Sequence, residues 1–127
     1  MSDYSNGSAT LTLEGATDAD RRVAVRRGYT GRVILVFMGG AYTVEVRAED
    51  ISATGMGVIV DRDLKMQFKC QIHLQLPERD RQLKTYQVPG KTVNSTLSTS
   101  RGGFRIGLVF LQPPPEFKQA VEAYVKR

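Results

Sequence analysis

The sequence has no tryptophan and only one histidine and one cysteine. His73 and Cys70 cannot by themselves fill a tetrahedral zinc site. Nucleophile–base catalysis needs a base held beside a nucleophile. Cys70 and His73 do not suit this pairing, because alternation along the segment 68–76 puts Cys70 on the apolar side and His73 on the polar side. We therefore expect a protein that is not an enzyme.

Long apolar runs are also missing. The longest run, Val33 to Met38, is far too short to cross a bilayer, and nothing resembles a signal peptide. A lone Cys70 cannot form an internal disulfide, which agrees with a reducing compartment. These absences predict a cytoplasmic location without a membrane span.

Positive charge is absent from the first 20 residues. Four of the 13 acidic residues precede Arg21, so the remainder of the chain carries 18 − 9 = +9. Residues 1–20 are polar without a sustained apolar period, which predicts a flexible N-terminal arm followed by one domain at 21–127. A basic domain is compatible with nucleic acid, a nucleotide phosphate or an acidic protein surface as partner.

The rest of the chain is dominated by strand signals. Gly39-Gly40 reads as a hairpin turn, and the connections between apolar or alternating segments are short with no interleaved helix. This pattern is typical of a small, closed or nearly closed antiparallel barrel. The six predicted strands are 33–38, which is expected to be buried, then 42–47, 57–60, 68–76, 84–99 and 104–110.

Two features refine this expectation. Pro89-Gly90 predicts a bulge or an edge within the long strand 84–99. After three consecutive prolines at 113–115, the apolar residues follow helical spacing, which predicts a C-terminal helix that plugs or flanks the barrel. The stripe consists of Phe117, Ala120, Val121, Tyr124 and Val125.

Two short patterns stand out against this barrel. The first is R-x-x-x-R at Arg22 and Arg26, extended by Arg21, and the second is D-x-S-x-x-G at Asp50, Ser52 and Gly55. Taken singly, an arginine run is usually solvated, and an Asp-x-Ser segment is usually a turn tightened by glycine. Glu49 should point away from Asp50 on an extended chain.

In this order, the two patterns resemble those of the PilZ domain family, bacterial receptors for the second messenger cyclic di-GMP. The resemblance implies a mainly β fold: a six-stranded antiparallel PilZ-type barrel with a C-terminal helix. It implies a receptor that changes conformation on binding and signals to an unidentified effector protein, with no cofactor besides the ligand. The ligand-binding residues it implies are Arg21, Arg22, Arg26, Asp50, Ser52 and Gly55.

The chemistry of these residues suits such a ligand. Arginine can form a forked contact with the O6 and N7 edge of guanine, stack on its ring or pair with a phosphate. Asp50 can accept from guanine N1–H and N2–H, Ser52 can serve a phosphate or base oxygen, and Gly55 permits a positive-φ turn or a close ligand approach. A basic Arg21 also resembles the arrangement that holds two stacked ligands, so one or two molecules per chain remain open.

Two other functions remain open: a PilZ-like adaptor that binds no nucleotide, and a small-barrel nucleic-acid binder. The scarcity of aromatics near the arginines, beyond Tyr29 and Tyr42, argues against the nucleic-acid binder. Lys91 and Arg105 are set aside as solvated strand cations. The glycine-rich stretch 27–31 predicts a loose hinge, with residues before Arg32 mobile in the absence of ligand.

Overall fold

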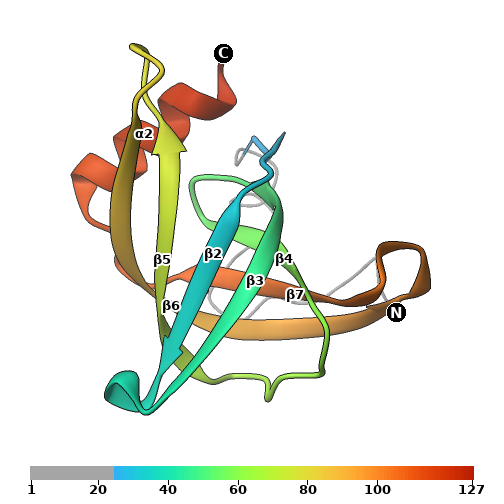
Figure 1. The fold of residues 1–127 in the computed structure, drawn as a ribbon. Helices are drawn as coiled ribbons and strands as arrows, with labels where there is room; N and C mark the ends of the chain where they lie inside the picture. The colour runs from blue at the N-terminus through green and yellow to red at the C-terminus, as the bar shows by residue number, and fades with distance from the viewer. Residues whose placement is uncertain (1–24) are drawn as a thin grey trace.

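The computed structural model describes residues 25–127, and it contains a single antiparallel sheet followed by one helix (Figure 1). Two short 3-10 turns, η1 (Met38–Gly40) and η2 (Thr99–Arg101), lie at the ends of hairpins. The helix is α2 (Pro115–Val125). The strands are β1 (Arg27–Gly28), β2 (Arg32–Phe37), β3 (Tyr42–Ile51), β4 (Gly55–Val60), β5 (Lys69–Pro77), β6 (Leu83–Ser98) and β7 (Gly103–Phe110).

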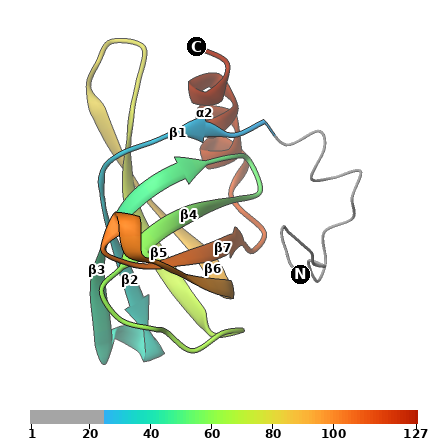
Figure 2. The same ribbon diagram turned by 90° about the vertical axis from the view of Figure 1, so that its right-hand side faces the viewer.

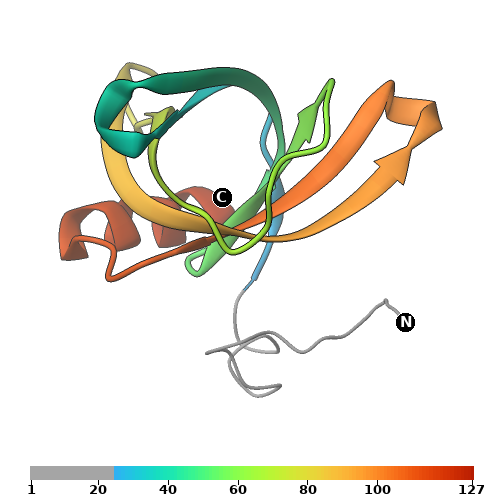
Figure 3. The same cartoon turned by 90° about the horizontal axis from the view of Figure 1, so that it is seen from below.

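Six of the strands close into a barrel. The order is β3-β2-β5-β6-β7-β4, and β4 pairs again with β3, so each of these strands has two neighbours. Figure 3 shows the resulting ring, with the β6–β7 hairpin extending beyond it. Strand β6 pairs with β5 over Leu83–Lys91 and with β7 over Gly90–Ser98, which lets one long strand serve both sides of the ring. The predicted six-stranded antiparallel barrel is confirmed.

Alternating side chains fill the barrel, and α2 covers one part of it. On β5, Cys70, Ile72, Leu74 and Leu76 are buried, as period-2 alternation predicts. The helix buries Phe117, whose ring packs edge-to-face on Phe110 and Tyr86 at centroid distances of 5.0 and 5.2 Å. The predicted helix therefore flanks the barrel.

Two strand predictions need correction. The run 33–38 is not fully buried: Ile34 is 37% exposed and Met38 is 66% exposed, because the outer face of a one-layer barrel meets solvent. Alternation along 68–76 predicted that Phe68 lies on the apolar side with Cys70, but Phe68 precedes β5 and is 39% exposed, so it does not belong to the buried row.

The bulge prediction in β6 was also misplaced. Pro89 and Gly90 pair regularly with Gln71 and Cys70, and the register shift lies between Thr92 and Asn94. The carbonyl of Pro89 faces the β7 side, where it accepts from Leu111 N–H at 2.8 Å. The missing N–H of Pro89 faces the same side, and β7 pairs with β6 only from Gly90 onward, so no ladder bond is lost.

Strand β4 approaches β7 very closely at its first residue. A Cβ atom on Gly55 would lie 2.2 Å from the carbonyl oxygen of Leu108, which is backbone and cannot turn away. The φ angle of Gly55 is not in the left-handed region, so the positive-φ explanation of this glycine is wrong. The close approach of β7 explains why glycine starts β4.

We expect Gly55→Ala to lower the free energy of unfolding by about 1–3 kcal/mol, because the added methyl group must push two paired strands apart. Urea denaturation followed by circular dichroism would measure this change. The matched control is Gly28→Ala, since a Cβ at Gly28 meets nothing within 4 Å. Equal stabilities of both variants would contradict the explanation.

Candidate functional site

The two sequence patterns meet at the end of β3. Arg26 Nη1 lies 2.6 Å from Asp50 Oδ1, although the two residues are 24 positions apart. The pairing of β1 with β3 brings them together, since Gly28 lies opposite Asp50 in the register. The Asp50 side chain is 23% exposed and that of Arg26 is 49% exposed, so the pair lies at the surface.

A β-bulge changes the direction of the acid next to Asp50. Ala48 pairs with Val58 and Asp50 pairs with Gly57, so Glu49 is an extra residue on β3. In a regular strand Glu49 and Asp50 would point to opposite faces, but a bulge disrupts this alternation. The prediction that Glu49 points away is therefore wrong.

Arg105 on β7 bridges the two carboxylates. Its Nε lies 2.8 Å from Glu49 Oε1, and its Nη2 lies 2.9 Å from Asp50 Oδ2. Arg101 in η2 forms a second ion pair with Glu49. Burial alone would lower the pKa of Arg105, but the carboxylates of Asp50 and Glu49 outweigh it and raise the pKa above its usual value.

The remaining two residues of the D-x-S-x-x-G pattern form the turn between β3 and β4. Ser52 is 1% exposed. Its N–H donates to Gly55 O at 2.8 Å, and its hydroxyl oxygen lies 3.3 Å from Gly55 O and 3.2 Å from the hydroxyl of Thr54. In this conformation Ser52 and Gly55 hold the turn and do not present polar side-chain groups to solvent.

Arg27 attaches β1 to the end of α2, beside which β1 lies in Figure 2. Arg27 Nη1 donates to the carbonyl oxygen of Tyr124 at 2.8 Å, and its guanidinium lies 4.5 Å from the centre of the Tyr124 ring. In return, the Tyr124 hydroxyl donates to Gly28 O at 3.0 Å. The residue that follows Arg26 therefore contacts the C-terminal helix directly.

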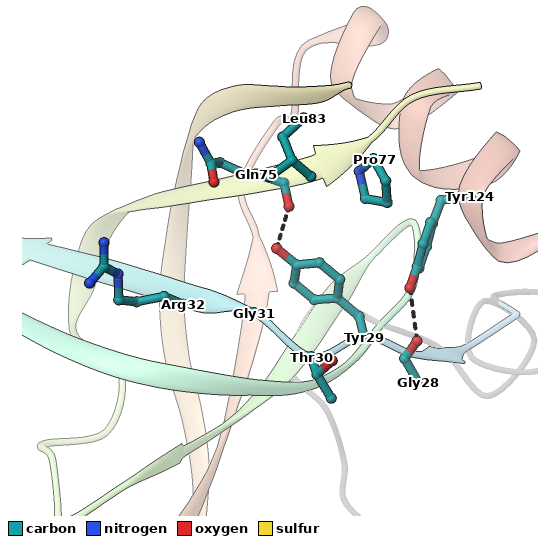
Figure 4. Close-up of a pocket in the computed structure, with 9 residues that line it drawn as sticks. All are labelled: Gly28, Tyr29, Thr30, Gly31, Arg32, Gln75, Pro77, Leu83 and Tyr124. Atoms are coloured by element: carbon teal, nitrogen blue, oxygen red, sulfur yellow. Dashed lines mark hydrogen bonds between the residues drawn. The ribbon is translucent and has the colours of Figure 1, made fainter. Parts of the chain in front are cut away.

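The stretch 27–31 is packed against the barrel, unlike the loose hinge predicted from its glycines. Tyr29 is 5% exposed, its N–H donates to Glu49 O at 3.1 Å, and its hydroxyl donates to Gln75 O. Its ring meets that of Tyr124 edge-to-face at 5.9 Å. Figure 4 shows Tyr29 pointing at Gln75, and Tyr124 standing beside Gly28. One buried aromatic side chain outweighs the flexibility of its glycine neighbours.

A small pocket of about 250 Å³ lies around these tyrosines (Figure 4). It is smaller than the usual 300–1,000 Å³ of small-molecule sites. Neither Arg26 nor Asp50 lines it, so the pocket and the ion-pair cluster are separate features. The lining residues are Gly28, Tyr29, Thr30, Gly31, Arg32, Gln75, Pro77, Leu83 and Tyr124.

Cys70 and His73 are the remaining candidates for reactive side chains. Cys70 is 7% exposed, and burial raises the pKa of its thiol to about 11, so it is protonated at neutral pH. His73 lies opposite Ile34 on the outer face of the sheet. Within residues 25–127, no group of three or more His, Cys, Asp or Glu residues is arranged to hold a metal ion.

The structure thus brings Arg26, Asp50, Ser52 and Gly55 to one end of the barrel, whereas Arg21 and Arg22 lie outside the described residues. Sequence reasoning missed Arg105, which had been set aside as a solvated cation. The sequence feature that could have pointed to Arg105 is Gly57, two residues after Gly55, the glycine of the D-x-S-x-x-G pattern. A side chain there would block the path from β7 to Asp50.

Comparisons with known proteins agree with this fold. A family model for the PilZ domain matches residues 20–127. No curated protein sequence matches significantly. Within the described part of the chain, no helix is long and apolar enough to cross a membrane.

Solved structures of PilZ proteins share the fold. Bacillus subtilis MotI/DgrA, an inhibitor of motility, matches with a TM-score of 0.74 at 16% identity over 84% of this chain and 50% of that chain. Escherichia coli YcgR in complex with c-di-GMP matches with a TM-score of 0.66 at 16% identity over 84% and 45%. The PilZ domain of YcgR with c-di-GMP matches with a TM-score of 0.61 at 14% identity over 84% and 89%.

This chain therefore spans about half the length of the MotI/DgrA and YcgR chains that it matches. The barrel, the C-terminal helix and the family match over residues 20–127 lead to one conclusion. The chain belongs to the PilZ domain family, a family of typically non-catalytic domains that bind cyclic di-GMP.

Proposed function

We propose that this protein is a receptor for cyclic di-GMP that changes conformation on binding and signals to a partner protein. The observation that carries the proposal is the 2.6 Å contact between Arg26 and Asp50, which joins the two sequence patterns at one surface position. An arginine and an aspartate side by side offer both kinds of group that the ligand requires: a cation for phosphate or the guanine O6/N7 edge, and an acceptor for guanine N1–H and N2–H.

The site has the exposure that ligand exchange needs. About half of the Arg26 side chain is in solvent, and an exposed ion pair contributes only about 0.2–1 kcal/mol to folding. Replacing Asp50 by a phosphate or guanine as the partner of Arg26 therefore costs the fold little. We assign Arg21 and Arg22 to the ligand as further cations, and Ser52 and Gly55 to the turn that presents Asp50.

A route for the signal starts at the next residue. Because Arg27 contacts Tyr124, a movement of Arg26 toward the ligand would pull on the end of α2. Helix α2 and β1 are therefore the elements that we expect to differ between the free and bound states. A partner protein would recognise this difference.

We expect Arg26→Ala to weaken cyclic di-GMP binding about tenfold to a hundredfold, since a charge-assisted contact contributes roughly 1.5–3 kcal/mol. Arg22→Ala should have a similar effect, and both variants should keep the thermal stability of the unmodified protein. Isothermal titration calorimetry measures the affinity.

Arg32→Ala is the matched control, because Arg32 is an exposed arginine on β2 whose ion-pair partner is Glu45, away from Asp50. Unchanged affinity in Arg22→Ala and Arg26→Ala would argue against the proposed site. An unmodified protein that does not bind cyclic di-GMP would favour the adaptor function. Displacement of the ligand by short RNA or single-stranded DNA would favour a nucleic-acid binder.

The stoichiometry of binding should depend on Arg21. Two stacked ligands bring four phosphates, whose mutual repulsion requires more cations than one ligand does. We expect calorimetry to give two ligands per chain for the unmodified protein and one for Arg21→Leu, with Arg32→Leu as the control. A ratio of one in the unmodified protein would rule out the stacked pair.

A further inference from the structure

Asp50 has its hydrogen-bonding capacity largely occupied in this structure. Its Oδ1 accepts from Arg26 Nη1 at 2.6 Å and from Gly57 N–H at 3.1 Å, and its Oδ2 accepts from Arg105 Nη2 at 2.9 Å. Each carboxylate oxygen has two lone pairs. A guanine edge that donates from N1–H and N2–H needs one site on each oxygen, so Oδ1 must first release a donor.

Arg26 is the donor that can leave. It lies before β1, which is only two residues long, and its side chain is 49% exposed. Arg26 contacts no other acceptor within the described residues. The Gly57 donor belongs to the backbone of β4, which pairs with β3 and β7 on its two sides, and cannot move away by a side-chain rotation.

Arg105 is the donor that stays. It lies in β7 opposite Ile59 of β4 and Thr96 of β6, and its side chain is 30% exposed. Its Nε also donates to Glu49 Oε1 at 2.8 Å, so the guanidinium is held at two points. A planar guanidinium with two fixed contacts defines the rotation of the carboxylate that it binds.

Gly57 makes this arrangement possible. A Cβ atom at Gly57 would lie 2.4 Å from Arg105 Nη2 and 3.1 Å from Asp50 Oδ1. The side chain of Arg105 can therefore cross β4 only where β4 has no side chain. The bulge at Glu49 completes the arrangement, since it turns the second carboxylate toward the same guanidinium.

We propose that Arg105 is the positioning residue of the site: it holds Asp50 in the rotation that accepts a guanine edge, while Arg26 leaves Asp50 for the ligand. This inference rests on the proposed function and explains how Asp50 would recognise the guanine base of the ligand. Arg105 acts through Asp50 and does not contact the ligand. Binding thus breaks the ion pair between Arg26 and Asp50 and keeps the one between Arg105 and Asp50.

The test compares two ligands that differ only in what Asp50 is expected to accept. Cyclic di-inosine monophosphate keeps both phosphates and N1–H but lacks the exocyclic N2 amine of cyclic di-GMP. In calorimetric titrations we expect Arg105→Gln to weaken cyclic di-GMP binding about tenfold and to weaken cyclic di-inosine binding clearly less. The preference for cyclic di-GMP over cyclic di-inosine monophosphate should therefore be smaller in Arg105→Gln than in the unmodified protein.

Gly57→Ala serves as a second variant, because it keeps Arg105 but pushes its guanidinium off Asp50, and it should reproduce the loss of preference. Arg101→Gln is the matched control, since Arg101 pairs with Glu49 and does not contact Asp50. It should change neither affinity more than about twofold. Thermal melting confirms that each variant is folded before its titration.

Three results would overturn the proposal. Equal losses for both ligands in Arg105→Gln would indicate a direct phosphate contact or a general structural role. Unchanged affinities for both ligands in Arg105→Gln would show that Asp50 is oriented without Arg105. Failure of the unmodified protein to bind cyclic di-GMP would overturn the proposed function, and this inference with it, before any variant is compared.

Discussion

The Asp50 carboxylate accepts hydrogen bonds from three separate segments of the chain: the arginine segment before β1, the backbone of β4 and the side chain of Arg105 on β7. These segments come together only because the barrel closes through the pairing of β3 with β4. The Arg26–Asp50 pair is the more exposed one and contributes little to folding. The barrel therefore holds the cluster in place, and the proposed ligand could replace Asp50 as the partner of Arg26 at little cost to the fold.

Close backbone approaches within the barrel are a second constraint on the site. Cβ atoms on Gly55 and Gly57 would meet Leu108 O at 2.2 Å and Arg105 Nη2 at 2.4 Å. One glycine lets β4 lie against β7, and the other opens the path for Arg105. The glycines of this strand thus set both the packing of the barrel and the geometry of the acid that the ligand is proposed to meet.

The contact between β1 and α2 gives the small domain a connection from the site to the far end of the chain. Tyr124 forms hydrogen bonds with Arg27 and Gly28. Its ring also packs edge-to-face on the ring of Tyr29. Burial raises the pKa of Tyr29, so its hydroxyl stays a donor to Gln75 O at neutral pH. The stretch that follows R-x-x-x-R is therefore packed against the barrel and α2 in this conformation.

Local patterns in the sequence were sufficient for the helix and the six barrel strands, but not for the short strand β1, which was predicted to be part of a loose hinge. Alternation predicted the apolar row from Phe68 to Leu76, which is buried except for Phe68. Helical spacing predicted α2, and Gly39-Gly40 predicted the first hairpin. These predictions succeed because side-chain periodicity is a property of neighbouring residues. The two patterns read together indicated that Arg26 and Asp50 serve one ligand, but they did not predict the direct contact between the two side chains.

Tertiary structure alone decided the rest. The bulge that turns Glu49 toward Arg105 depends on how β3 and β4 pair, and the missing side chain of Gly57 matters only because Arg105 crosses that position from β7. The burial of Tyr29 likewise depends on Gln75 and Tyr124, which are 46 and 95 residues away in sequence. By itself the sequence determined the six barrel strands, the helix and the polar groups available for a ligand, because these follow from local periodicity and side-chain chemistry. Which of those groups contact one another depended on strand register, which brings distant residues together only when the barrel closes.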